Sequence, residues 1–138
     1  MKTRLDEAQR QPARIAGPID KLYQTLQAGE ADRDKLTSPR LQVEYDYAYG
    51  RILAAKARND GYNQMLAALK NGKGPKDSSS NEYVLEPADN YETNSALKKM
   101  AEKAKLYLDR VVKDHPGTPW AKLAEDDLQI PMGWKFSE

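Results

Sequence analysis

The chain has 138 residues, and its 22 Lys and Arg nearly balance its 21 Asp and Glu, leaving a net charge of +1. This balance excludes a global electrostatic preference for nucleic acid or anionic membranes, and the absence of cysteine excludes disulfides, thiolate nucleophiles and cysteine-based zinc sites. No apolar run approaches the ~20 residues of a membrane span, and the N-terminus lacks the apolar region of a signal peptide. We therefore expect a soluble chain, cytoplasmic by default, with no membrane insertion. Because it begins in polar, helix-like sequence, we also expect it to be a fragment.

The first predicted helix covers residues 18–28 and ends before Gly29, a typical helix stop. A proline at its first position is favourable because the missing N–H would have no helical partner there. Four apolar side chains share one face of this helix: Ile19, Leu22, Tyr23 and Leu26. Residues 1–16 are expected to form a separate, looser helix, since Pro12 and Gly17 argue against one unbroken rod.

The clearest predicted element is a long helix over residues 39–70. Ser38 and Pro39 indicate its start, because a serine hydroxyl can cap the first amides of a helix and proline suits the first helical position. Asn71 and Gly72 indicate its end. Along the helix, mostly apolar side chains recur at alternating spacings of four and three, as in an a/d seam. The seam consists of Leu41, Tyr45, Ala48, Ile52, Ala55, Asn59, Tyr62, Leu66 and Leu69, and it is widened into a broader face by Tyr49, Leu53, Ala57 and Met65. Gly61 is a weak point, since glycine costs about 1 kcal/mol in a helix interior, but the seam stays in phase across it. We expect one continuous or kinked helix about 48 Å long.

A polar linker with a short extended segment is predicted over residues 73–92. Tyr83 to Leu85 have strand character that Pro87 is expected to stop, and in the tail from Ile130 to Phe136 the apolar residues alternate. The two extended segments could pair as a small two-stranded ribbon. Otherwise the tail packs as an extended arm over the helices.

Two further helices are predicted, over residues 95–113 and from Pro119 to Leu128, with Thr118 as the cap of the second. The short connection between them predicts an antiparallel hairpin. The fold class is therefore all-α: antiparallel helical hairpins with one long helix and an extended aromatic tail. The expected parts are residues 1–72, 73–92 and 93–138, together forming one compact domain.

The stretch 101–128 resembles one tetratricopeptide-type hairpin, in which Ala104, Ala121 and Ala124 would allow close helix approach. A longer resemblance rests on five segments: Asp32 to Arg40, Tyr45 to Lys56, Tyr62 to Ala67, His115 to Ala121, and Pro131 to Lys135. In this order the chain resembles the C-terminal helical region of large von Willebrand factor A domain proteins of planctomycete-type bacteria, from about residue 15 onward. The resemblance implies a helical appendage of an adhesion or scaffold protein and carries no activity with it.

No catalytic, metal-binding or cofactor-binding residue is predicted. His115, the one histidine, is interpreted as a helix C-terminal residue that favours the dipole when protonated. The segment 77–81 superficially resembles the metal motif of the A domain, but it ends in asparagine and follows no apolar strand. The Gly72-x-Gly74 pair lacks the remaining residues of a phosphate loop. Acidic runs such as 125–127 are interpreted as solvated helix surface.

The predicted function is that of a non-enzymatic helical protein-interaction or scaffold module. The long helix exceeds its intrachain partners in length, so surplus seam surface could bind a protein partner or a second copy, as in a homodimer. The candidate interaction surface consists of Tyr45, Tyr47, Arg51, Tyr62, Leu66 and Leu69. The alternative is a nucleic-acid-binding domain, in which exposed tyrosines would stack on bases beside arginines. An enzyme built on carboxylates and tyrosines ranks third.

Overall fold

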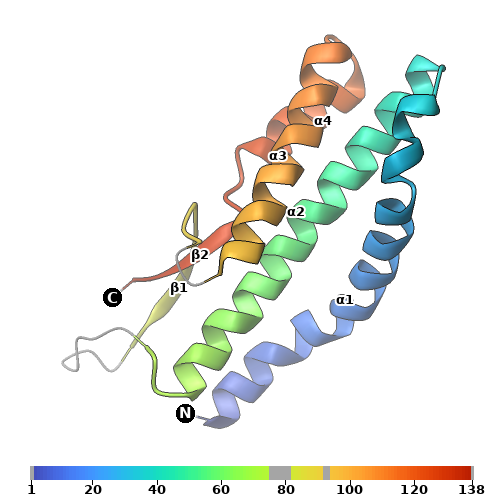
Figure 1. Cartoon of the computed structure of the whole chain (residues 1–138). Coiled ribbons are helices and arrows are strands. Elements are labelled where there is room, and N and C mark those ends of the chain that lie inside the picture. The colour runs from blue at the N-terminus through green and yellow to red at the C-terminus, as the bar shows by residue number, and fades with distance from the viewer. Residues whose placement is uncertain (1, 75–81, 92–93, 138) are drawn as a thin grey trace.

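Three helices side by side dominate the computed structural model, which describes residues 2–74, 82–91 and 94–137 (Figure 1). The long helix α2 (Pro39–Lys70) lies between α1 (Lys2–Ala28) and α3 (Ser95–Asp114), and it also contacts α4 (Pro119–Leu128). The only strands among the described residues form a two-stranded ribbon. The predicted mainly helical fold is confirmed. No helix in the described ranges is both long and apolar enough to span a bilayer.

α1 corrects the first sequence expectation, because one helix runs from Lys2 to Ala28 with Pro12 and Pro18 inside it. A proline in a helix interior removes one backbone hydrogen bond and bends the helix, without ending it where tertiary contacts hold both sides. α1 is visibly bent along α2 in Figure 1. Its end immediately before Gly29 is as predicted.

A 3-10 helix that the sequence did not predict, η1 (Glu30–Lys35), connects α1 to α2. It has no buried residue, so apolar periodicity gives no signal for it. Its side chains instead reach across to α2 and α3 through polar contacts.

α2 is continuous over residues 39–70, as predicted. The predicted cap is wrong, because the Ser38 side chain makes no cap hydrogen bond. Pro39 begins the helix with its ring-fixed φ and leaves one fewer amide to satisfy. The preceding turn is tied down by Gln42, whose side-chain amide donates to the carbonyl of Leu36 at 2.6 Å.

The buried surface of α2 differs from the predicted seam. Leu41, the first seam residue, is 51% exposed, whereas Leu53 and Ala57, expected only to widen the seam, are almost fully buried. Val43, which lies outside the predicted face, is almost fully buried as well. The reason is that α1 and α3 pack on two sides of α2, so no single stripe describes its burial. A β-carbon on Gly50 would lie 2.9 Å from Leu108 Cγ of α3, which shows how closely these helices approach.

The predicted boundaries of α3 and α4 are confirmed to within one residue. Thr118 caps α4 as predicted, accepting a hydrogen bond from the amide of Ala121, and Asn94 caps α3 in the same way with Ala96 and Leu97. Small buried side chains let the two helices pack together: Ala101, Ala104, Ala121 and Ala124. The likeness to a tetratricopeptide hairpin stays a prediction.

The predicted ribbon is confirmed. β1 (Val84–Ala88) pairs antiparallel with β2 (Gly133–Ser137). Pro87 does not stop the strand as expected, and it lies opposite Trp134 in the register. A two-stranded ribbon has an open edge on each strand, where a residue without an N–H is tolerated. The segment 77–81, discussed above for its likeness to a metal motif, lies outside the described residues.

Candidate functional site

An open groove of about 730 Å³ lies between α1 and α2. One wall is formed by side chains of α1 between Glu7 and Ile19, and the other by side chains of α2 between Arg51 and Tyr62. Ile15 in the first wall is an apolar side chain that is 52% exposed among the described residues. The volume is in the range of about 300–1,000 Å³ typical of ligand sites.

Two lysines of α2 bind α1 beside this groove. Lys56 Nζ contacts Asp20 at 2.5 Å, and Lys70 Nζ contacts Asp6 and Gln9, both at 2.6 Å. These polar contacts fix the position of α1 relative to α2, and with it the spacing of the two groove walls.

The third wall comes from the C-terminal part of the chain and is positioned by Arg58. Its guanidinium donates to the main-chain carbonyls of Asp127 at 3.3 Å, Ile130 at 3.0 Å and Pro131 at 3.2 Å, which lie at the end of α4 and just beyond it. Burial lowers the pKa of Arg58, while the nearby Asp127 charge opposes this. Arg58 thus ties the end of α4 to the middle of α2.

Trp134 of β2 completes this wall. Its indole Nε1 donates to the main-chain carbonyl of Arg58 at 2.8 Å, and its ring meets Tyr62 edge-on at a centroid distance of 5.2 Å. Gly61 makes the approach possible, because a β-carbon there would lie 3.2 Å from Trp134 Cδ1. The glycine that looked like a weak point of the long helix is the position where the aromatic tail docks.

Two polar atoms at the groove have no partner. Asn59, 8% exposed, has an unpaired side-chain Nδ2, and Asp127 has an unpaired Oδ2. Among the described residues, the only other buried side-chain atom without a hydrogen bond is His115 Nε2. Both atoms are enclosed by the protein, so neither is presented to the open space of the groove.

The six residues of the predicted interaction surface do not form one patch. Arg51 and Tyr62 line the groove, and Tyr47 accepts a hydrogen bond from Arg51 at 2.8 Å beside it. Leu66 is buried inside the chain, and Leu69 is half-buried near Gly74.

Tyr45, the sixth of these residues, is used internally. Its hydroxyl donates to the main-chain carbonyl of Leu26 at 2.6 Å, and its ring contacts those of Tyr49 and Tyr107. Sequence reasoning also missed Trp134 and the apolar face of residues 8–19 as groove walls. One signal was available for the groove: a polar residue, Asn59, stands in the middle of an otherwise apolar seam.

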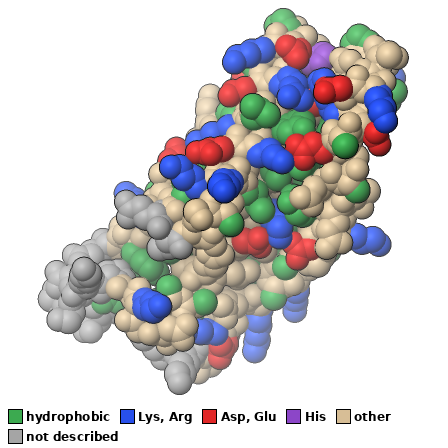
Figure 2. All heavy atoms as spheres, in the orientation of Figure 1, with side chains coloured by type: hydrophobic (Ala, Val, Ile, Leu, Met, Phe, Trp, Pro, Cys, Tyr) green, Lys and Arg blue, Asp and Glu red, His purple; other side chains and the backbone are tan. Residues whose placement is uncertain are grey.

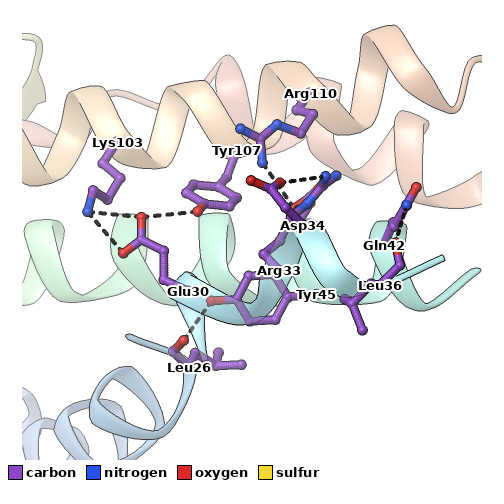
Figure 3. Close-up of polar contacts among 11 residues, drawn as sticks. Leu26, Glu30, Arg33, Asp34, Leu36, Gln42, Tyr45, Lys103, Tyr107 and Arg110 are labelled. Carbon is purple, nitrogen blue, oxygen red and sulfur yellow. Dashed lines mark hydrogen bonds and ion pairs between the residues drawn. The ribbon is translucent and has the colours of Figure 1, made fainter. Parts of the chain in front are cut away.

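A second polar cluster joins η1 to α2 and α3, as Figure 3 shows. Glu30 accepts hydrogen bonds from Tyr49 at 2.9 Å, Tyr107 at 3.1 Å and Lys103 at 3.1 Å. Burial raises the pKa of Tyr107 to about 12, with the Glu30 carboxylate adding to the effect. Every polar group named here is already paired, so the cluster is a structural clamp and offers no open position to a substrate. No group of three metal-ligating side chains occurs in the part of the chain that the structure describes.

The clamp predicts an acid-sensitive contribution to stability. Burial acts to raise the pKa of Glu30, but the hydrogen bonds from Lys103, Tyr49 and Tyr107 outweigh it, so the pKa is lowered. A lowered folded-state pKa means that the stabilisation is present above the unfolded value of about 4.3 and is lost as pH falls through the folded value. Urea unfolding between neutral pH and about pH 3 should show that Glu30→Gln reduces this loss. Glu44→Gln, which alters an exposed pair, should leave the loss as in the wild type. Equal acid sensitivity of wild type and Glu30→Gln would contradict the assignment.

Comparison with known proteins gives no further constraint: no family model, no curated protein and no solved structure matches this chain.

Proposed function

We propose that this chain is a non-enzymatic protein-interaction module, and that the groove between α1 and α2 binds a segment of a partner protein. The observation that carries the proposal is the groove itself. Apolar side chains of two helices line a shared space that the described residues leave unfilled, and Ile15 remains half exposed there. An apolar groove with a few convergent polar groups is the usual form of a binding site.

Charge at the groove supports a protein partner over nucleic acid. Arg51 and Arg58 are matched by Glu7 and Asp127 in the same walls, and the guanidinium of Arg58 is engaged by main-chain carbonyls. On the face drawn in Figure 2, basic and acidic side chains are interspersed, without a basic stripe. Phosphate binding relies on clustered, unpaired positive charge, which these walls do not offer.

The resemblance to the C-terminal region of von Willebrand factor A domain proteins is part of the same proposal. It assigns the module to the end of a larger adhesion or scaffold protein. An A domain encoded upstream in the same open reading frame would support this assignment, and a gene that contains only this module would contradict it.

Selection of peptides from a random phage-displayed library tests the binding proposal. Ala55 is half-buried in the groove wall, so Ala55→Trp should fill the groove and weaken binding of the selected peptides at least tenfold. The matched control is Ala67→Trp on the exposed side of the same helix, outside the groove, which should bind as the wild type does.

Two outcomes would contradict this proposal. One is a selection that yields no peptide, and the other is a set of peptides that bind Ala55→Trp as tightly as they bind the wild type. Sedimentation of the free protein tests whether a second copy of the chain occupies the groove instead. A wild-type dimer that Ala55→Trp converts to a monomer would show that it does.

A further inference from the structure

The side of α1 that faces away from α2 carries positive charge that the rest of the described chain leaves unpaired. Four basic side chains are exposed there, and none of them forms an ion pair or a side-chain hydrogen bond with a described residue: Arg4, Arg10, Arg14 and Lys21. Asp6 and Asp20 do not balance them, because both carboxylates pair with lysines of α2. Of the acidic residues of α1, only Glu7 is left to offset this charge.

Large apolar side chains lie in the same surface as these charges. Residues four apart are neighbours on a helix, so Arg14 lies next to Arg10 on one side and next to Pro18 on the other. The next position in this row is Leu22, which is 52% exposed, and Ile15, two turns before it, is equally exposed. We call this surface the basic face of α1, and it consists of Arg4, Arg10, Arg14, Ile15, Lys21 and Leu22.

The outer side of α3 shows that such a face is not general to this chain. Lys98, Lys99 and Lys113 are exposed there, again without an ion pair to a described residue, but Glu102 and Asp109 are exposed on the same side of the helix. The charges of α3 therefore offset one another, whereas those of α1 add. The near-neutral net charge of the whole chain conceals this local asymmetry.

The combination of charge and apolar surface selects the kind of partner. A second copy of the same face would bring like charges together, which is unfavourable. Nucleic acid would use the cations but leave Leu22 and Ile15 without apolar contacts, and α1 offers no exposed aromatic ring for base stacking, since Tyr23 is half-buried with its ring beside Lys56. The surface of an anionic bilayer satisfies both parts, because its headgroups attract lysine and arginine and its interface accepts apolar side chains.

We propose that the basic face of α1 docks this chain on the surface of a membrane that contains anionic phospholipids. α1 forms an outer edge of the helical layer, so its basic face can lie along a membrane without rearrangement of the fold (Figure 1). The contact is peripheral, with the cations at the headgroups and with Ile15 and Leu22 at the boundary of the acyl chains. Because only Ile15 of this face lines the groove, this inference does not rest on the proposed function.

Co-sedimentation with phosphatidylcholine vesicles, prepared with and without phosphatidylserine, tests the proposal. The protein should bind only the vesicles that contain phosphatidylserine. Raising the salt from about 0.1 M to about 1 M should release it, because the screening length falls from about 10 Å to about 3 Å. Arg10→Gln/Arg14→Gln/Lys21→Gln should weaken binding about 100-fold, at about fivefold for each basic residue.

The matched control is Lys98→Gln/Lys99→Gln/Lys113→Gln, which removes the same charge from α3 and should bind the vesicles nearly as tightly as the wild type does. Leu22→Gln should weaken binding about threefold to fivefold through the loss of apolar contact. Leu106→Gln, a change of a leucine that is 54% exposed on α3, should leave binding unchanged. Every substituted side chain is exposed, so all variants should keep the Tm of the wild type.

Three outcomes would overturn the proposal. The first is an absence of binding to phosphatidylserine vesicles at about 0.1 M salt, and the second is an equal loss of binding in the two triple variants. The third is binding of duplex DNA or polyglutamate through the basic face of α1 while vesicles do not bind, which would identify a nucleic acid or an acidic protein as the partner. The groove is tested separately, because the selected peptides should still bind the triple variant of α1.

Discussion

Arg33→Met is expected to lower the free energy of unfolding by about 3 kcal/mol. Asp46 is fully buried in α2, and Arg33 of η1 is its main partner, with Nε 2.9 Å from Oδ1 and Nη2 on Oδ2. Arg110 of α3 lies at 3.5 Å and remains as a weaker partner. Methionine keeps the length of the side chain but carries no positive charge and no N–H donor. The buried Asp46 carboxylate therefore loses most of the hydrogen bonds and charge that stabilise it. Urea unfolding at neutral pH measures the loss.

The matched control for this prediction is Arg40→Met, which breaks an exposed pair with Glu44 on the same helix. Exposed pairs contribute about 0.3–0.5 kcal/mol at such spacings, so this change should be small. The double variant Arg33→Met/Asp46→Leu should recover much of the lost stability, because an apolar pair leaves no buried charge behind. A loss for Arg33→Met no larger than that for Arg40→Met would contradict the role assigned to the Arg33–Asp46 contact.

Gly50→Ala is expected to destabilise the protein by about 1–2 kcal/mol, although alanine is the better helix former by about 1 kcal/mol. The added β-carbon would lie 2.9 Å from Leu108 Cγ and 3.2 Å from the Leu108 main-chain nitrogen. A side chain can rotate away, but the backbone of α3 can retreat only if the two helices separate. Thermal and urea unfolding of the single variant measure the net effect.

Leu108 itself gives the second half of this prediction. Leu108 is fully buried, so Leu108→Ala should cost about 2–5 kcal/mol through lost burial and a cavity. In that background Gly50→Ala should cost much less, because the contacts with Leu108 Cγ and Cδ2 are removed and only the 3.2 Å approach to the main-chain nitrogen remains. The coupling energy of the double-mutant cycle should then exceed about 1 kcal/mol.

Gly29→Ala is the control for the loss of glycine flexibility alone. Gly29 has φ −86° and ψ −6°, which alanine adopts without strain, and an added β-carbon would meet only Leu26 O at 3.6 Å and Tyr45 Cε2 at 3.7 Å, so alanine should stabilise by about 0.4–1 kcal/mol. The two glycine substitutions should therefore act in opposite directions. If both stabilise the protein, the close approach of α2 and α3 at Gly50 is not as described.

Local signals in the sequence predicted those features that depend only on residues close together in the chain. A proline at the first helical position and a glycine or asparagine after the last one predicted the bounds of α2 at Pro39 and Lys70. Thr118 predicted the start of α4. The alternating tail predicted a ribbon partner because alternation is a property of any half-buried strand.

The same reasoning failed where a distant contact overrides a local preference. Pro12 and Pro18 did not end α1, because contacts to α2, such as Lys56 with Asp20, hold the helix on both sides of its bend. Ser38 makes no cap, and η1 has no periodicity that could have indicated it.

The candidate site was the part least accessible to the sequence. Arg51 and Tyr62 were selected in advance, but the walls that make them a site come from α1, the end of α4 and β2. Trp134 reaches α2 across a sequence separation of 76 residues. No local pattern contains such a pairing.

By itself, the sequence determined the bounds of α2, α3 and α4 to within one residue, the Thr118 cap and the pairing tendency of the tail, because each depends on nearby residues. Only the tertiary structure decided that α1 is one helix, which faces of α2 are buried, and that Gly50 and Gly61 are contact positions. The physical reason is that α2 packs on more than one side. Shape and long-range polar contacts determine which elements pack against α2, and the apolar pattern of one helix carries no information about either.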